Sequence, residues 1–259
     1  MPEIKAIIFD IDGTVIDTEK DGHRVAFNDT FREFGFDFAW DVDKYHELLQ
    51  IAGGKERIRR YFQQEGLFQD PGLDELVEKL HRRKTEIFIA LIENRRLPLR
   101  AGIKRLMTGA MKAGLMLGVC TTANERSVNA IIRVMLPEIH FEFVLAGNTV
   151  RRKKPDPEIY LLALEKTGLH AGSCVVIEDS ANGVQAAKAA GMFVVATTNL
   201  YTEREDLDAA DIIVTSLGEP GGEKGILKKS NRNFEFEGCF YIETLINCFS
   251  RQPSSARHG

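Results

Sequence analysis

Short apolar runs and amphipathic segments alternate along most of this chain. The runs at residues 115–120 and 173–178 are almost continuously apolar, which is typical of strands buried on both faces of a sheet. Further apolar runs occur at residues 5–9, 141–145, 192–196 and 211–214. Segments with helical spacing separate them, at residues 102–113, 124–135, 157–166 and 180–190. This alternation predicts an α/β fold, in which a parallel sheet carries helices on both faces.

Residues 18–96 interrupt the alternation. Apolar side chains recur there near helical spacing, as at Phe27 and Phe31, and the segment shows no strand pattern. Helices are predicted over residues 25–34, 41–50 and 55–65 and from Pro71 to about residue 91. We therefore predict a helical cap domain at 18–96, inserted after the first strand of a core formed by residues 1–17 and 97–217.

The chain beyond residue 217 carries a weaker signal. Residues 218–222 are rich in glycine and predict a linker, and residues 228–233 are polar. Residues 234–249 favour a short strand and a helix, and residues 251–259 are typical of a disordered tail. We therefore predict that residues 218–259 form a C-terminal extension that is partly disordered.

Composition and charge argue against several classes of partner. The 259 residues are 44% apolar and 28% charged, and the net charge of −4 argues against general nucleic-acid binding. No run approaches the roughly 18 apolar residues that a membrane span needs. The four cysteines lie far apart, without the paired spacing of a metal site. We expect a soluble monomer that binds a small molecule, with no nucleic acid and no membrane as partner.

Two acids and a glycine follow the first apolar run. Asp10 and Asp12 are two residues apart, so in an extended chain their side chains leave on the same side, and Gly13 permits a sharp turn. Two like charges this close repel each other unless a cation or a shared proton relieves the repulsion. Taken alone, the pattern also fits an acidic turn after an edge strand.

Three further polar segments belong at the same edge of the predicted sheet. Residues 121–124 (TTAN) place hydroxyls and backbone donors at a helix start, an arrangement that binds anions. Residues 153–155 (KKP) supply ammonium groups, and residues 178–180 (EDS) supply two acids at the end of a strand. Ligands of open parallel sheets bind beyond the carboxyl ends of the strands, so we expect these groups to meet. Together they indicate a phosphate held beside Mg²⁺.

These residues resemble a known family. The DIDGT sequence at residues 10–14, Thr121, the Lys154-Pro155 pair and the EDS sequence at 178–180 are similar, in order and spacing, to the four motifs of the haloacid dehalogenase-type phosphohydrolases. The resemblance covers about residues 1–217. It implies a Rossmann-like core with a helical cap.

The resemblance also implies a mechanism. Asp10 is the expected nucleophile, which forms an aspartyl phosphate, and Asp12 is the expected general acid and base. Thr121 and Lys154 are expected to hold the phosphoryl oxygens. The implied cofactor is Mg²⁺, bound by Asp10, the backbone carbonyl of Asp12, Asp179 and, directly or through water, Glu178.

Glycines and basic residues in the cap bear on the substrate. Gly53-Gly54 precedes Lys55 and Arg57, and a second basic cluster occupies residues 81–85. Charge runs are usually solvated helix faces, and we interpret Arg59, Arg60 and Arg82 in this way. For Lys55 beside the glycine turn we favour a second anion site.

The cap is similar to that of the CbbY-type branch, at residues 26–31, 53–58 and 81–85. Members of this branch are xylulose-1,5-bisphosphate phosphatases, which remove a Rubisco inhibitor that arises beside the Calvin cycle. By position, the resemblance implies that the remote phosphate is held by Lys55, Arg57, Lys84 and Arg100, with Asp17 near the sugar hydroxyls. The other substrate-binding residues that we expect are Gly53, Gly54, His81, Thr122 and Asn124.

Three positions depart from the branch. Asp17 stands where Glu is usual, Ala101 stands where Pro is usual, and His23 comes one residue later than the corresponding histidine. The role of His23 therefore stays open.

Other readings of the same motifs remain. A β-phosphoglucomutase-type phosphotransferase shares cap and core, and a phosphoglycolate-type phosphatase belongs to the same branch. A receiver domain phosphorylated on aspartate would lack both the second acid and a long insertion. For a xylulose-1,5-bisphosphate phosphatase we expect the plastid stroma in a photosynthetic eukaryote and the cytoplasm in an autotrophic bacterium.

Overall fold

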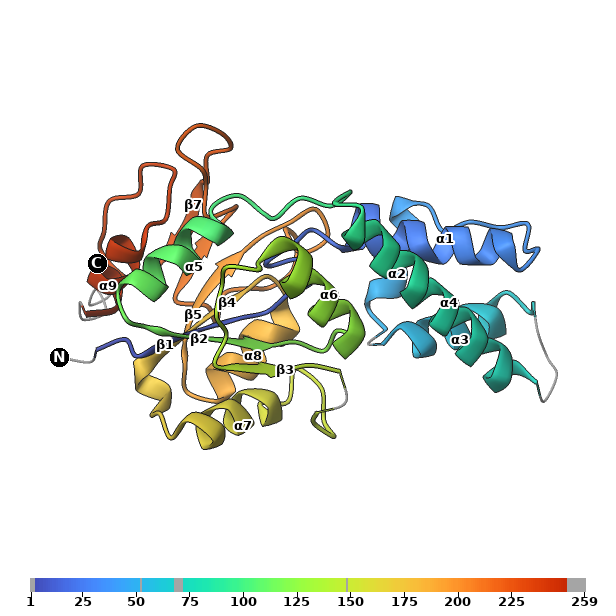
Figure 1. Cartoon of the computed structure of the whole chain (residues 1–259), viewed down its shortest axis with the longest axis horizontal. Helices are drawn as coiled ribbons and strands as arrows, with labels where there is room; N and C mark the ends of the chain where they lie inside the picture. The colour runs from blue at the N-terminus through green and yellow to red at the C-terminus, as the bar shows by residue number, and fades with distance from the viewer. Residues whose placement is uncertain (1–2, 52, 68–71, 148, 251–259) are drawn as a thin grey trace, which may run out of the picture.

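The chain folds into an α/β core and a helical lobe that stand side by side (Figure 1). The computed structural model describes residues 3–51, 53–67, 72–147 and 149–250. Pro71, the predicted start of a helix, and the predicted disordered tail at residues 251–259 lie outside the described residues.

Seven strands within the described residues form a single sheet: β1 (Ala6–Phe9), β2 (Met116–Cys120), β3 (Phe143–Leu145), β4 (Cys174–Glu178), β5 (Phe193–Thr197), β6 (Ile212–Val214) and β7 (Leu227–Ser230). Their order is β3-β2-β1-β4-β5-β6-β7, and all neighbours are parallel except β6 and β7. In the centre, Phe9 of β1 pairs with Val119 of β2 and Ile177 of β4. This register brings the carboxyl ends of the three strands to one edge of the sheet.

Helices cover both faces of the sheet: α5 (Ile103–Lys112), α6 (Glu125–Met135), α7 (Glu158–Thr167), α8 (Ala181–Ala189) and α9 (Ile242–Ser250), with a 3₁₀ turn η2 (Ala171–Ser173) before β4. Alternate side chains of β1 enter different layers. Ile7 and Phe9 belong to the apolar cluster that includes residues of α5, α6 and α9, whereas Ala6 and Ile8 belong to the cluster with α7 and α8. The two-sided burial explains why the strand reads as a continuous apolar run.

The second lobe, called the cap below, consists of η1 (Glu19–His23), α1 (Arg24–Glu33), α2 (Val42–Leu49), α3 (Gly54–Gln64) and α4 (Leu73–Glu93). Its described residues contain no strand, in agreement with the sequence pattern. An aromatic cluster fills its interior, where the rings of Phe27 and Phe31 each lie 4.8 Å from the ring of Trp40. The two segments that connect core and cap lie side by side, since Ile16 forms an antiparallel bridge to Leu99.

Residues after 217 contribute to the core more directly than the sequence pattern indicates. Strand β7 falls largely in residues 228–233, which the sequence marked only as polar, and it extends the sheet next to β6. An edge strand is held by backbone hydrogen bonds and tolerates lysine, so its apolar pattern is weak. Helix α9 packs on the sheet, with the ring of Phe249 lying 5.4 Å from that of Phe193. None of the described helices is long and apolar enough to cross a membrane.

Candidate active site

A cavity of about 1100 Å³ lies between the carboxyl edge of the sheet and the cap. Most of the residues singled out from the sequence meet there. Those that line the cavity are Asp10, Asp12, Gly53, Gly54, Lys55, Arg57, His81, Lys84, Thr121, Thr122, Asn124, Lys154 and Asp179. The ends of parallel strands and the facing helices of the cap therefore build one site.

Three carboxylates gather at the core end of this cavity, and an ammonium group contacts two of them. Lys154 Nζ donates to Asp10 Oδ1 at 2.7 Å, to Glu178 Oε1 at 2.6 Å and to the backbone carbonyl of Cys120 at 2.9 Å. Asp10, Glu178 and Asp179 are all buried, and an oxygen of each lies within 4.8 Å of the others. One lysine does not balance three carboxylates. This donor set fits a divalent cation that prefers oxygen ligands.

The excess negative charge, together with burial, shifts the pKa of two of these acids upward. Burial, and after it the charge of Glu178, raises the pKa of Asp10 to about 7 against the opposing effect of Lys154. Burial and the charges of Glu178 and Asp10 raise the pKa of Asp179 well above its usual range. A bound cation would return both groups to their ionised form.

Two glycines allow these acids to approach the backbone. Gly13 has a φ of +81°, and a Cβ atom there would come within 2.2 Å of Asp179 Oδ2. A Cβ atom on Gly183, in the first turn of α8, would come within 1.8 Å of Glu178 Oε1. The acid cluster therefore depends on glycine at both positions.

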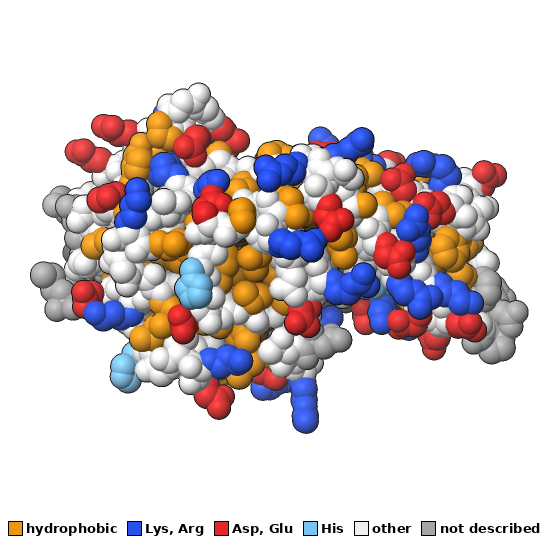
Figure 2. All heavy atoms as spheres, in the orientation of Figure 1, with side chains coloured by type: hydrophobic (Ala, Val, Ile, Leu, Met, Phe, Trp, Pro, Cys, Tyr) orange, Lys and Arg blue, Asp and Glu red, His pale blue; other side chains and the backbone are white. Residues whose placement is uncertain are grey.

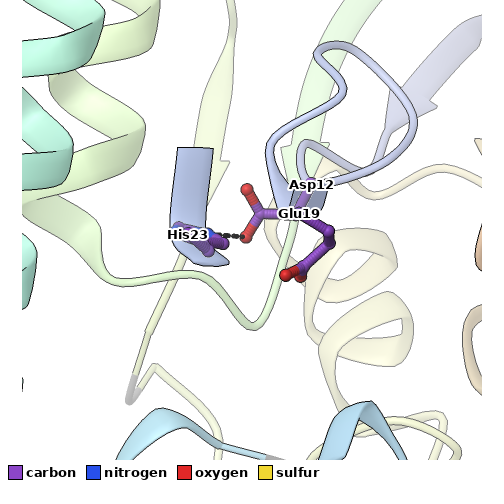
Figure 3. A group of neighbouring side chains, drawn as sticks. All are labelled: Asp12, Glu19 and His23. Carbon is purple, nitrogen blue, oxygen red and sulfur yellow. Dashed lines mark ion pairs between the residues drawn. The ribbon is translucent and has the colours of Figure 1, made fainter. Parts of the chain in front are cut away.

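Asp12 faces the cap rather than the acid cluster. Thr18 donates to its Oδ1 at 2.7 Å, and His23 Nε2 lies 3.3 Å from its Oδ2 (Figure 3). Burial alone would raise the pKa of Asp12, but His23, Thr18 and Lys84 together lower it to about 2. The two neighbouring acids thus have opposite electrostatic environments, which raise the pKa of Asp10 and lower the pKa of Asp12.

His23 reaches Asp12 because η1 is a π-helical turn. The backbone N–H of His23 donates to the carbonyl of Thr18 at 2.6 Å, a bond that spans five residues rather than four. A π turn accommodates one additional residue within a helix. This explains how a histidine that stands one residue late in the sequence still enters the site. Its Nδ1 contacts Lys84 Nζ at 2.8 Å, and since an ammonium group only donates, this nitrogen accepts.

Asp12, Glu19 and His23 form a second group whose ligand atoms lie within 4.8 Å of one another (Figure 3). Both nitrogens of His23 already have partners, and Glu19 accepts from the hydroxyl of Tyr45 at 2.5 Å. Hydrogen bonding within the protein accounts for this group.

Polar groups that follow β2 also line the cavity. Thr121 is buried, and its Oγ1 accepts from the N–H of Ala123 at 3.2 Å. Asn124 caps α6, since its Oδ1 accepts from the N–H of Arg126 at 3.0 Å. The start of α6 therefore faces the cavity, as the anion-binding prediction requires.

The cap supplies cations at the other end. Arg57 is buried and donates to the carbonyl of Leu48 at 3.0 Å and to the hydroxyl of Tyr45 at 3.2 Å. Lys55 pairs with the exposed Glu78 at 2.6 Å. Burial and the neighbouring Lys84 and Lys55 lower the pKa of His81 to about 4, so its ring is uncharged at neutral pH.

Charged side chains of both signs are interspersed over the outer face of the cap (Figure 2). Arg83 and Glu33, both of the cap, form one such surface ion pair at 2.6 Å. Arg59 and Arg82, which we interpreted as solvated, border the cavity, although Arg59 is paired with Asp74 at 2.9 Å.

Asp17 and Arg100 do not line the cavity, in contrast to the expectation from the resemblance. Asp17 is exposed on the linker. The guanidinium group of Arg100 donates to Thr197 Oγ1 at 2.8 Å, to the carbonyl of Thr198 at 2.5 Å and to the carbonyl of Gly13. Carbonyls of the core thus engage the side chain that was expected to hold a phosphate, and Arg100 ties the linker to the sheet.

Two further side chains contact the acid cluster, and neither was predicted from the sequence as a site residue. Thr14 Oγ1 donates to Asp179 Oδ1 at 3.1 Å, and Asn199 Nδ2 donates to Asp179 Oδ2 at 2.7 Å. Asn199 follows β5, so the rule of strand ends would have identified it if applied to this strand as well.

Comparison with known proteins agrees with this geometry. A family model described as haloacid dehalogenase-like hydrolase matches residues 4–191. The chain is 46% identical over 226 residues to a CBBY-like protein of Arabidopsis thaliana, which covers 85% of this chain and 71% of that protein. Protein CbbY of Cereibacter sphaeroides is 42% identical over 228 residues, with 86% of this chain and 96% of that protein covered.

A solved structure of a relative shows the same similarity in three dimensions. The crystal structure of a D10N variant of CbbY from Rhodobacter sphaeroides, in complex with xylulose-(1,5)bisphosphate, matches with a TM-score of 0.74 at 38% identity. The match covers 84% of this chain and 98% of that one. The chain belongs to the haloacid dehalogenase-like hydrolases, and it is a hydrolase of phosphoric monoesters. Within that family it belongs to the CbbY-like branch.

Proposed function

We propose that this protein is a Mg²⁺-dependent phosphatase that hydrolyses xylulose-1,5-bisphosphate to xylulose 5-phosphate and so removes a Rubisco inhibitor. The observation that carries the proposal is the distribution of charged groups between the two ends of the cavity. Its core end has an acid cluster with Lys154, and its cap end has Lys55, Arg57 and Lys84. A substrate with one phosphate at each end matches this arrangement, and the solved structure of the relative contains such a ligand.

Asp10 is the proposed nucleophile. One carboxylate oxygen attacks phosphorus, the bond from phosphorus to the sugar oxygen breaks, and an aspartyl phosphate forms on Asp10. Lys154 and Thr121 hold the non-bridging oxygens. Mg²⁺, held by Asp10, the backbone carbonyl of Asp12, Asp179 and, directly or through water, Glu178, would neutralise charge on the phosphoryl group.

Asp12 is the proposed general acid and base. Its low pKa keeps it ionised in the free protein, and an incoming phosphate raises that pKa through like-charge repulsion. The carboxylate therefore takes up a proton from solvent as the substrate binds, and the protonated carboxyl transfers that proton to the departing sugar oxygen. In the second half, Asp12 takes a proton from water, and the water oxygen attacks phosphorus and releases phosphate from Asp10. His23 and Thr18 orient the carboxylate throughout.

A substrate panel tests the proposal. Phosphate release should be measured with and without Mg²⁺ on xylulose-1,5-bisphosphate, ribulose-1,5-bisphosphate, glucose phosphates and phosphoglycolate. We expect the highest kcat/KM with xylulose-1,5-bisphosphate and loss of activity when Mg²⁺ is chelated. Equal activity on small monophosphates would contradict the assignment of the cap end, and an isomerised sugar phosphate without net phosphate release would indicate a mutase.

The cap end should also show a pH dependence. Burial lowers the pKa of Lys84 to about 8, so this side chain is cationic at pH 7 and loses its charge as the pH rises past 8. We expect the KM for the bisphosphate to increase roughly tenfold between about pH 7 and 9, because a charged hydrogen bond to the ligand is lost. The Lys84→Met variant should have a high KM at every pH. A rise of KM with pH that persists in this variant would assign the titration to another group.

A further inference from the structure

Tyr201 belongs to the core in sequence but to the cap in its packing. It follows β5 in a segment, residues 198–205, that we call the Tyr201 loop. The residue is 3% exposed, and its side chain lies in the apolar cluster of the cap, where Tyr201 is the one core residue among those described. The ring centroid lies 6.0 Å from that of Tyr45 and 5.4 Å from that of His46, with interplanar angles of 74° and 83°. Both partners are on α2, and such edge-on contacts are favourable.

The Tyr201 loop is anchored to the core on both sides of this tyrosine. Asn199 Nδ2 donates to Asp179 Oδ2 at 2.7 Å and to the carbonyl of Gly13 at 3.3 Å, while its Oδ1 accepts from the N–H of Tyr201 at 2.9 Å. At the other end, Glu205 Oε2 accepts from the N–H of Ala181 at 2.7 Å, at the start of α8. The loop is therefore a short, fixed connection between the acid cluster and the cap.

The cap partner of Tyr201 is itself part of the site. The hydroxyl of Tyr45 accepts from Arg57 at 3.2 Å and donates to Glu19 at 2.5 Å. The ring of Tyr201 thus packs against the residue that orients a cation at the cap end. A continuous series of contacts runs from Asp179 through Asn199, Tyr201 and Tyr45 to Arg57.

We propose that Tyr201 and Asn199 are positioning residues. Tyr201 docks the cap on the core, and Asn199 fixes the position of the Tyr201 loop through its hydrogen bond to the side chain of Asp179. These contacts hold the two ends of the cavity at the separation seen in this structure. The role in docking follows from the contacts, and only its effect on kinetics rests on the proposed function.

Substitutions of Tyr201 can distinguish docking by its ring from docking by its hydroxyl group. Tyr201 Oη has no hydrogen-bond partner among the described residues. Tyr201→Phe should therefore behave as the native protein, whereas Tyr201→Ala should not. Leu200→Ala is the matched control, since Leu200 is the preceding residue in the same loop and is 48% exposed.

Hydrogen exchange measured by mass spectrometry on the metal-free protein tests the docking directly. In Tyr201→Ala we expect the amides of α2 to exchange about tenfold faster, the factor that corresponds to the loss of the two ring contacts with Tyr45 and His46. Asn199→Ala should increase exchange in the Tyr201 loop and in α2. Native exchange in α2 of Tyr201→Ala would overturn the docking role, and native exchange in α2 of Asn199→Ala would overturn the role of Asn199.

Kinetics supplies the second readout. If the undocked cap lowers the fraction of binding-competent protein, KM should rise about tenfold in Tyr201→Ala while kcat changes little. A kinetic defect in Tyr201→Phe equal to that in Tyr201→Ala would assign the effect to the hydroxyl and overturn docking by the ring. Exchange needs no substrate, so a chain that releases no phosphate from any sugar phosphate but shows the exchange response would disprove the proposed function and keep the docking role.

Discussion

Turnover is expected to disappear in the Asp10→Asn variant while the fold remains. The amide keeps the shape of the side chain and can still accept from Lys154, but it cannot form an aspartyl phosphate. Loss of an activated nucleophile typically reduces kcat by roughly 10⁴-fold or more. The measurement is Mg²⁺-dependent phosphate release from xylulose-1,5-bisphosphate, together with a thermal melt.

The melt distinguishes loss of chemistry from loss of structure. The pKa of Asp10 is raised to about 7 in the folded protein, so its ionised form destabilises the fold as the pH rises above the unfolded value. Removing the charge should leave the Tm of the metal-free protein at pH 7 unchanged or higher. Asp29→Asn, on the cap surface beside Arg32, serves as the control and should keep native activity. Near-native turnover by Asp10→Asn would refute the nucleophile assignment.

Lys154→Met is expected to have the largest effect on stability. The lysine is buried and contacts both Asp10 and Glu178, so its removal leaves buried carboxylates without a counter-charge. Breaking a buried ion pair from one side typically costs about 3–5 kcal/mol. A urea melt of the metal-free variant should show this loss, and added Mg²⁺ should restore part of it because a cation replaces the missing charge. Phosphate release should fall to the background rate.

The neighbouring Lys153 provides a matched substitution. It is only partly buried, and Lys153→Met removes the same charge without stripping the acid cluster of its partner. We expect a change in the free energy of unfolding below about 0.5 kcal/mol, as for most surface positions. Equal destabilisation by both substitutions would show that net charge, and not the buried contact of Lys154, holds the cluster together.

The acid cluster could be predicted because it depends on backbone topology. Apolar runs separated by helical segments specify a parallel sheet, and the carboxyl ends of its strands meet at one edge. Asp10, Thr121 and Asp179 each come directly after such a run, so their meeting in one cavity follows from the pattern. Asn199 obeys the same rule after β5, and its contact with Asp179 was accessible by the same reasoning.

His23 shows where a linear pattern stops being sufficient. In a regular helix, one additional residue rotates every later side chain by about 100° away from its former direction. The π turn at Glu19–His23 absorbs the residue and keeps the ring on Asp12. Whether a helix takes up an insertion in this way depends on the packing of the ring, here 4.0 Å from that of Phe88, which lies 65 positions further along the chain.

The sequence by itself determined the α/β fold, the all-helical character of the insert and the edge of the sheet at which the acids gather, because strand and helix periods are local properties of the chain. The tertiary structure decided where the long side chains lie. Arg100 was expected at a phosphate but donates to core carbonyls, and Tyr201 leaves the core to pack in the cap. Such flexible or amphipathic side chains have several accessible partners, and the choice among them depends on contacts between segments distant in sequence.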